Sequence, residues 1–267
     1  MTLPQKNILN FINNIQRSGT SILPCNLPVE TKSTPSLESA LLKKVDDFCN
    51  LPHQEDLPKT THFIFVIDSS GSMSYGKEIT IKGYNDQIET VIKEAKNTGE
   101  TYVTFIDFNT VVNLRNLQSE PQSAPKLTGK TYTPEGGTAL YDAVGVALEK
   151  ALELKHIQGK NTGVFISLLT DGEENSSKYM SASTIQDIMN KLEPLGKFTF
   201  GLMGPNKSLE SMAQVLSIKK GNYAGFDPNC LQGKLHSMDQ MTAATMSYSS
   251  LRGANIASAE CLYDPKK

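Results

Sequence analysis

Three short segments of the chain combine carboxylates, hydroxyls and glycines in a pattern that suits a metal ion. They are Asp68-Ser69-Ser70-Gly71-Ser72, residues 133–138 (TPEGGT) and residues 170–175 (TDGEEN). Oxygen ligands without thiolate or imidazole favour Mg²⁺, Mn²⁺ or Ca²⁺ over zinc or copper. The alternate positions 68, 70 and 72 let a tight loop aim three side chains at one point, and Gly71 relieves the backbone there. The segments therefore predict a site for a hard divalent cation.

The charge of such a site leaves room for one more ligand. Two acids and three hydroxyls carry two formal negative charges, which one divalent ion neutralises. The ion then keeps a position for an anionic ligand, such as a carboxylate of another molecule. One of these segments alone is also ordinary turn and helix-capping chemistry. Three of them in order, each in a predicted loop, favour metal binding.

The segments follow or precede the elements of a predicted α/β sheet. HFIFVID (62–68) and GVFISLLTD (163–171) are continuous apolar runs that end in an acid. Such runs are typical of strands buried on both faces of a parallel sheet. Only Asn109 and Thr110 separate the strands predicted at 101–108 and 111–117. A parallel crossover needs about a dozen residues or more, so the strand at 111–117 is predicted to be an antiparallel edge strand.

The remaining pattern alternates helices with strands. Two further strands are predicted at 197–203 and 221–226, and helices are predicted at 77–96, 139–154, 181–193, 207–218 and 228–245. This alternation predicts an open, doubly wound sheet with helices on both faces. Ligands of such sheets lie beyond the carboxyl ends of the strands, at the switch point. The first and third polar segments are expected there, on adjacent central strands.

The chain is predicted to have three parts: an N-terminal helical and linker extension (1–60), a main domain (61–245) and a C-terminal tail (246–267). In the extension, the pattern predicts an amphipathic helix at 4–16 and a linker at 18–36. A second helix is predicted from Pro35 to Phe48, with Thr34 as its N-cap. The tail is expected to be poorly ordered or to dock elsewhere.

Composition excludes several classes of protein. The 267 residues include 26 Lys and Arg against 28 Asp and Glu, a net charge of −2, so the basic surplus of a nucleic-acid binder is missing. No apolar run approaches the roughly 20 residues of a membrane span. The N-terminus lacks a signal-peptide core, which leads us to expect a cytoplasmic protein. The scattered cysteines, Cys25, Cys49, Cys230 and Cys261, indicate neither a zinc nor a redox site.

The motifs resemble those of the von Willebrand factor A domain family. IFVIDSSGSM, TPEGGTALYDAV and LLTDGEEN match its characteristic segments, and the resemblance covers residues 61–226, extending to about 245. It implies a Rossmann-like, mostly parallel six-stranded sheet with one antiparallel edge strand. It also implies a complete metal-ion-dependent adhesion site for Mg²⁺, or for Mn²⁺ on the same oxygens. The ligands implied at that site are Asp68, Ser70, Ser72, Thr138 and Asp171.

In that family, the two serines and the threonine contact the metal directly, and the two aspartates often act through water. A partner protein completes the coordination with an Asp or Glu. The resemblance therefore predicts a non-enzymatic, Mg²⁺-dependent protein-interaction module with adhesive function. Intracellular relatives suggest an alternative, an adaptor or regulatory subunit of an ATPase or stress-response complex.

A metal-assisted hydrolase with Asp68 as nucleophile is less favoured. Ser70 stands where an Asp-x-Asp phosphatase places its general acid, and neither a Gly-x-Ser-x-Gly elbow nor a P-loop is present. No catalytic or organic-cofactor residue is therefore assigned.

The pattern also predicts the roles of some single residues. Asp107 is predicted to cap a turn, and Glu173 and Glu174 are predicted to lie on a solvated loop rather than to steer a cation. The methionines of the last predicted helix are expected in the core, with an adaptable contact surface as the alternative. They are Met238, Met241 and Met246.

Overall fold

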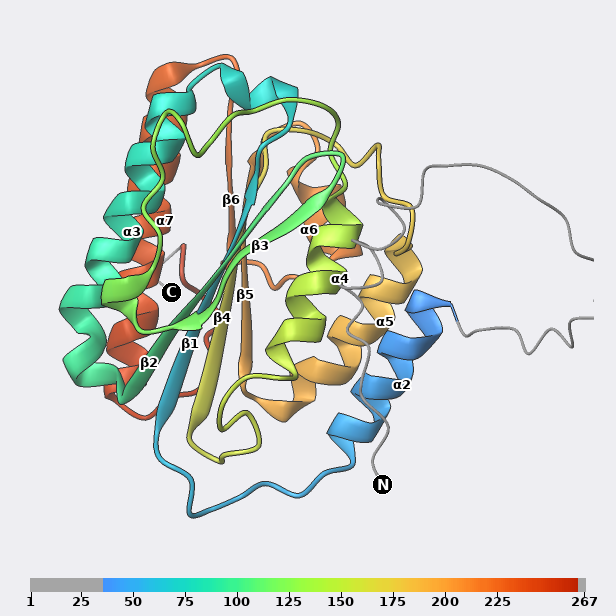
Figure 1. Ribbon diagram of the computed structural model, residues 1–267, viewed down its shortest axis with the longest axis vertical. Coiled ribbons are helices and arrows are strands. Elements are labelled where there is room, and N and C mark those ends of the chain that lie inside the picture. Colours follow the sequence, from blue (N-terminus) through green and yellow to red (C-terminus); the bar gives the residue numbers. More distant parts are fainter. Residues whose placement is uncertain (1–35, 264–267) are drawn as a thin grey trace, which may run out of the picture.

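The computed structural model describes residues 36–263, which form one six-stranded sheet between two layers of helices (Figure 1). The strand order is β3-β2-β1-β4-β5-β6, and only β3 runs antiparallel to its neighbour. This confirms the predicted fold class and the antiparallel edge strand. The strands are β1 (Thr60–Asp68), β2 (Glu100–Phe108), β3 (Val112–Ser119), β4 (Thr162–Leu169), β5 (Phe198–Pro205) and β6 (Tyr223–Phe226).

The helices cover both faces of the sheet, as Figure 1 shows. On one face lie α3 (Lys77–Thr98) and α7 (Leu231–Gly253), which pack along each other. The other face carries α2 (Leu37–Cys49), α4 (Leu140–Ala151), α5 (Ala182–Leu192) and α6 (Leu209–Val215). Three short 3₁₀ turns complete the elements: η1 (Gly71–Ser74), η2 (Pro121–Ser123) and η3 (Glu193–Leu195).

The central strand β1 is buried along its whole length because both of its faces carry apolar side chains. Phe63, Phe65 and Ile67 belong to the core beneath α3 and α7. Ile64 and Val66 alternate with them and belong to the core beneath α4 and α5. Successive side chains of a strand point to opposite faces, and here both faces are covered by an apolar core. The strand is therefore a continuous apolar run in the sequence and not an alternating one.

The switch point of the sheet lies between β1 and β4. After β1 the chain adds β2 and β3 on one side, and it then returns through α4 to place β4 on the other side of β1. Ile67 pairs with Leu169 in the register of these two strands. The loops that follow β1 and β4 therefore begin side by side, which brings Asp68 next to Thr170.

The start of α2 differs from the prediction. The helix begins at Leu37, and its N-cap is Ser36, whose Oγ accepts a hydrogen bond from the Ser39 N–H at 3.2 Å. The predicted cap, Thr34, lies outside the described residues. The predicted helix at 4–16 and all but the last residue of the predicted linker lie outside them too.

The last helix is longer than predicted, since α7 ends at Gly253 rather than near residue 245. The buried face of α7 includes Met241, Thr245, Tyr248 and Arg252, which are spaced by three and four residues. Because Thr and Arg are not apolar, the hydrophobic pattern of the sequence does not show this part of the helix. The Arg252 side chain is fully buried and donates to the carbonyls of Thr60 and Asn161. These bonds hold the end of α7 against the start of the sheet.

Within residues 36–263, no helix has the length and apolar character that crossing a membrane requires. In the same part of the chain, neither Cys49 nor Cys230 forms a disulfide.

Candidate metal centre

The structure brings the five predicted ligands together at the switch point, from three loops. Asp68 ends β1; Ser70 lies just before the η1 turn that follows it, and Ser72 lies within that turn. Thr138 precedes α4, and Asp171 follows β4. All except Ser72 are buried.

The carboxylate of Asp68 is fully buried and held by its own loop and by β4. Its Oδ1 accepts from the Ser70 N–H, and its Oδ2 accepts from the Thr170 hydroxyl, both at 2.6 Å. Burial raises the pKa of Asp68 to about 6, although the hydrogen bonds from Thr170 and Ser70 act in the opposite direction. The Asp68 carboxylate is thus shielded from bulk solvent, and the two groups that donate to it, from Ser70 and Thr170, are neutral.

A chain of oxygen contacts links the first loop to the third. The hydroxyls of Ser70 and Ser72 lie 3.1 Å apart, and the Ser72 hydroxyl donates to Asp171 Oδ1 at 2.5 Å. These oxygens form a compact polar cluster, in which Ser70 and Asp171 are buried and Ser72 faces solvent.

Thr138 reaches the same cluster from the second loop. A Cβ built on Gly172 would lie 3.1 Å from Thr138 Oγ1 and 3.6 Å from Ser72 Oγ, so both hydroxyls border Gly172. The backbone of Thr138 is held by Asn175, whose Oδ1 accepts from the Thr138 N–H at 2.9 Å. The threonine hydroxyl is therefore placed by the third loop, next to the serine of the first.

Backbone bonds join the first and second loops. The Gly71 N–H donates to Gly136 O at 3.0 Å, and the Glu135 N–H donates to Ser69 O at 2.8 Å. Gly136 has a φ of 71°, which favours glycine because other residues are strained there. The Thr110 hydroxyl, at the β2–β3 hairpin, accepts from the Gly137 N–H at 2.9 Å. These hydrogen bonds fix the positions of the first and second loops relative to each other and to the β2–β3 hairpin.

The donor set fits a hard divalent cation. It comprises two buried carboxylates and three hydroxyls, with no sulfur or nitrogen ligand among them. Among residues 36–263, no three His, Cys, Asp or Glu side chains gather into a cluster, which is the composition a zinc site would need. Two buried carboxylates require a counter-charge, and the ammonium of Lys234 contacts Asp171 but not Asp68.

Sequence reasoning missed Lys234, a buried lysine in the first turn of α7. Its ammonium lies 2.8 Å from Asp171 Oδ2. The position was inside a predicted helix, but no local pattern links residue 234 to residue 171.

Sequence reasoning also missed Tyr132, whose buried hydroxyl donates to Asp68 O at 2.5 Å. Burial raises the pKa of Tyr132 well above its usual value, and the nearby Asp68 and Asp171 raise it further.

Three smaller predictions need correction. Glu174 is not a solvated loop residue, because its carboxylate accepts from the Tyr141, Ser176 and Ser177 N–H groups at 2.7 to 3.0 Å. It braces the third loop against the start of α4. Glu173, by contrast, is exposed, as predicted.

Asp107 does not cap a turn; instead it forms a bidentate pair with Arg115 across the hairpin, at 2.7 and 2.8 Å. Of the methionines in α7, Met238 and Met241 are in the core as predicted, but the prediction is wrong for Met246, which is 48% exposed.

An open groove of about 500 Å³ adjoins the cluster, at the carboxyl ends of β5 and β6. Its lining includes Asp171, Glu173, Asn206, Lys207 and Phe226. The groove has both charged and apolar walls, and it opens on the same edge of the sheet as the candidate ligands.

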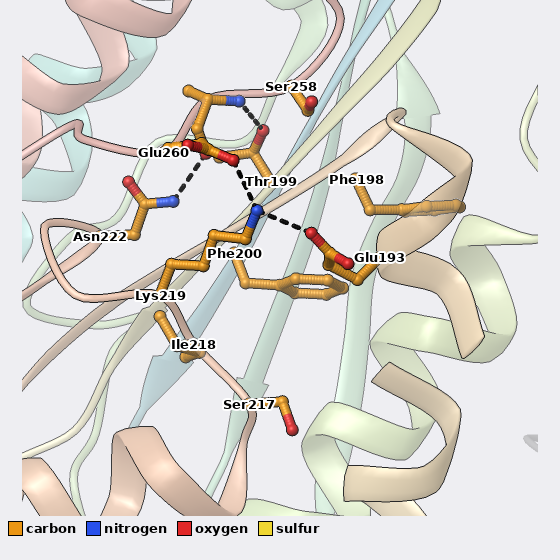
Figure 2. A pocket seen from close by; sticks show the side chains of 11 residues that line it. Glu193, Phe198, Thr199, Phe200, Ser217, Ile218, Lys219, Asn222, Ser258 and Glu260 are labelled. Carbon is orange, nitrogen blue, oxygen red and sulfur yellow. Dashed lines mark hydrogen bonds and ion pairs between the residues drawn. The ribbon is translucent and has the colours of Figure 1, made fainter. Parts of the chain in front are cut away.

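A second hollow, drawn in Figure 2, lies near the amino end of β5 and shares no residue with the candidate metal centre. Its volume is about 30 Å³, room for roughly one water molecule. Lys219 spans it by pairing with Glu193 at 2.6 Å and with Glu260 at 2.7 Å (Figure 2). This hollow is too small for an organic ligand.

Known structures share this fold. The structure is similar to the vWF domain of the type V pili tip protein Mfa5 from Porphyromonas gingivalis, with a TM-score of 0.51 and 10% identity over 76% of this chain and 98% of that one. The chain therefore has the von Willebrand factor A fold. At this identity the likeness shows the fold and not the function. Neither a protein-family model nor a curated protein matches the amino-acid sequence.

Two more distant likenesses are to a von Willebrand factor type A protein from Catenulispora acidiphila and to manganese-loaded TRAP protein from Plasmodium vivax. The first has a TM-score of 0.42 and 16% identity over 70% of this chain, which spans only 43% of that protein's length. The second has a TM-score of 0.44 and 17% identity over 67% of this chain and 72% of that one.

Proposed function

We propose that this protein is an interaction module that binds an Asp or Glu of a partner protein through a divalent metal ion, Mg²⁺ or Mn²⁺. The observation that carries the proposal is the chain of oxygen contacts through Ser70, Ser72 and Asp171 at the switch point of the sheet. The von Willebrand factor A fold, shared with a pilus tip protein, supports an interaction role by analogy.

The five residues divide the work of holding the ion. Ser70, Ser72 and Thr138 offer neutral hydroxyl oxygens, and Asp68 and Asp171 offer the negative charge. When bound, the ion supplies a Lewis-acidic position for a carboxylate. The adjoining groove beside Asn206, Lys207 and Phe226 gives room for the partner residues that flank that carboxylate. Because the partner carboxylate is desolvated on binding, removal of the metal would cost most of the affinity.

The geometry of Asp68 supports a role that is not enzymatic. A nucleophilic carboxylate must reach its substrate, but Asp68 is fully buried, and both of its oxygens accept hydrogen bonds, from Ser70 and Thr170. The regulatory-subunit alternative and the cytoplasmic location stay predictions.

Two serines of the same loop provide a matched test. Titration calorimetry with MgCl₂ and MnCl₂ compares wild type, Ser72→Ala and Ser74→Ala. Ser74 is exposed, and its hydroxyl donates to Pro134 O at 3.4 Å, away from the predicted ligands. We expect wild type and Ser74→Ala to bind alike and Ser72→Ala to bind at least tenfold more weakly. Equal binding by the two variants would overturn the site.

Retention of partner proteins on the immobilised chain tests the second half of the proposal. We expect a protein that is retained in Mg²⁺ by wild type and Ser74→Ala, and lost in EDTA or with Ser72→Ala. A chain that binds metal, but whose retained proteins ignore both EDTA and Ser72→Ala, would contradict the partner role.

A further inference from the structure

The strongest unassigned feature is the buried ammonium of Lys234 at the edge of the candidate metal centre. The lysine side chain is 5% exposed, and that of its partner Asp171 is 1% exposed. This is therefore a buried ion pair, at 2.8 Å, and not one of the screened surface pairs that contribute little.

The groups that surround the Lys234 ammonium come from two separate loops, the one after β1 and the one after β4. Besides Asp171, its ammonium donates to the carbonyl of Tyr75 and lies 5.5 Å from the centre of the Tyr75 ring. Its aliphatic part packs on Gly76, where an added Cβ would lie 2.7 Å from Lys234 Cδ. The Lys234 side chain is thus closely packed, and its contacts connect the first turn of α7 to the loop after β1 and to the loop after β4.

Asp171 is shared between this lysine and the predicted ligands. Its Oδ2 accepts from Lys234, and its Oδ1 accepts from Ser72. A divalent ion bound through Asp171 and Ser72 would therefore lie only a few ångströms from a positive charge that is shielded from water. In a site of low dielectric such like charges repel each other strongly.

We propose that Lys234 is an internal counter-cation of this site, which neutralises Asp171 in the metal-free protein and competes with the divalent ion for it. The inference rests on the proposed function. It makes Lys234 a residue that lowers the affinity of the site for the metal. Loading with metal weakens the lysine pair and frees the ammonium.

Lys234 could affect the affinity for the metal in two opposite ways. The ammonium could also strengthen metal binding by orienting Asp171, but Ser72 already holds the other oxygen of that carboxylate. We therefore expect the repulsion to prevail. Lys234→Gln keeps a donor for Asp171 without the charge, whereas Lys234→Met removes both. Lys220→Met is the matched control, since it removes one positive charge from an exposed position.

Titration with MgCl₂ and MnCl₂ is the direct measurement. We expect Lys234→Gln and Lys234→Met to bind at least tenfold more tightly than wild type, or about 1.4 kcal/mol, and Lys220→Met to match wild type. Equal or weaker binding by the two Lys234 variants would overturn the inference while wild-type binding upholds the proposed function. If no protein binds either ion, the proposed function itself fails.

A measurement on wild type covers the case in which the Lys234 variants do not fold. Amine labelling read by mass spectrometry compares Lys234 with Lys220, with and without saturating MgCl₂. Competition requires that labelling of Lys234 rise at least threefold with metal while labelling of Lys220 stays constant. Unchanged labelling of Lys234 in the metal-saturated protein would contradict the inference.

Discussion

The hydroxyl of Thr170 donates a hydrogen bond to Asp68 Oδ2 at 2.6 Å, although the two residues are 102 positions apart in the chain. The bond joins the ends of β1 and β4 at the switch point. It gives a buried carboxylate one of its two donors, with the other coming from Ser70 within the same loop. The stability of the metal-free site therefore depends on a residue outside the predicted ligand set.

Thr170→Val removes this donor while keeping the shape of the side chain. We expect the free energy of unfolding to fall by about 1–3 kcal/mol, because Asp68 Oδ2 is left buried without a partner. Urea unfolding of the metal-free protein measures the change. Thr90→Val is the control, since its hydroxyl donates only to the Asp86 carbonyl within α3, and its loss should be nearly neutral. Similar losses for the two variants would argue against this role of Thr170.

The buried His62 should make the free energy of unfolding depend on pH. Its side chain is buried in β1, its Nε2 contacts Lys155 O at 2.9 Å, and burial lowers its pKa from 6.5 to about 4. The unfolded chain therefore binds a proton before the folded one as pH falls. This group stabilises the fold above pH 6.5, and its contribution of about 3 kcal/mol is lost between pH 6.5 and 4.

A variant isolates the contribution of His62 from that of other groups. Asp68 acts in the opposite direction, since its raised pKa of about 6 means that the folded state takes up the proton first. Unfolding free energies of wild type and His62→Gln are compared at pH 7 and pH 4.5. We expect His62→Gln to lose less stability on acidification than wild type. Parallel losses would show that His62 does not titrate in this way.

Gly83 sets the close approach of α3 to α7. A Cβ at this position would lie 2.4 Å from the Sδ and 2.7 Å from the Cβ of Met238. Glycine to alanine in a helix normally stabilises by about 0.5–1 kcal/mol. Gly83→Ala is expected instead to lower the unfolding free energy by about 1–3 kcal/mol, because the buried helix interface is overpacked.

A double-mutant cycle checks that the cause is the contact with Met238. Met238→Ala alone leaves a cavity and costs about 2–5 kcal/mol. In its background, Gly83→Ala should cost less than 0.5 kcal/mol or stabilise the protein, as measured by thermal or urea unfolding. If Gly83→Ala costs the same in both backgrounds, the strain lies elsewhere.

The sequence by itself determined the layout of the sheet and where its polar loops begin. Buried strands in a parallel sheet must be apolar on both faces, so 62–68 and 163–171 were recognisable, and the acids at their ends marked the loops. The two residues between β2 and β3 allowed only a hairpin. The strands and the hairpin depend on residues that are close together in the sequence, so the local sequence pattern is enough to predict them.

Only the tertiary structure decided which distant side chains share a partner. Lys234 meets Asp171 across 63 positions, Asp107 pairs with Arg115 and not with a turn, and Arg252 extends α7 by contacting β1. Each of these residues is polar or charged, so by pattern it belongs on the surface. Lys234, Asp107 and Arg252 are nevertheless buried, because the assembled elements supply each of them with a counter-charge or a carbonyl, and such partners are visible only in the tertiary structure.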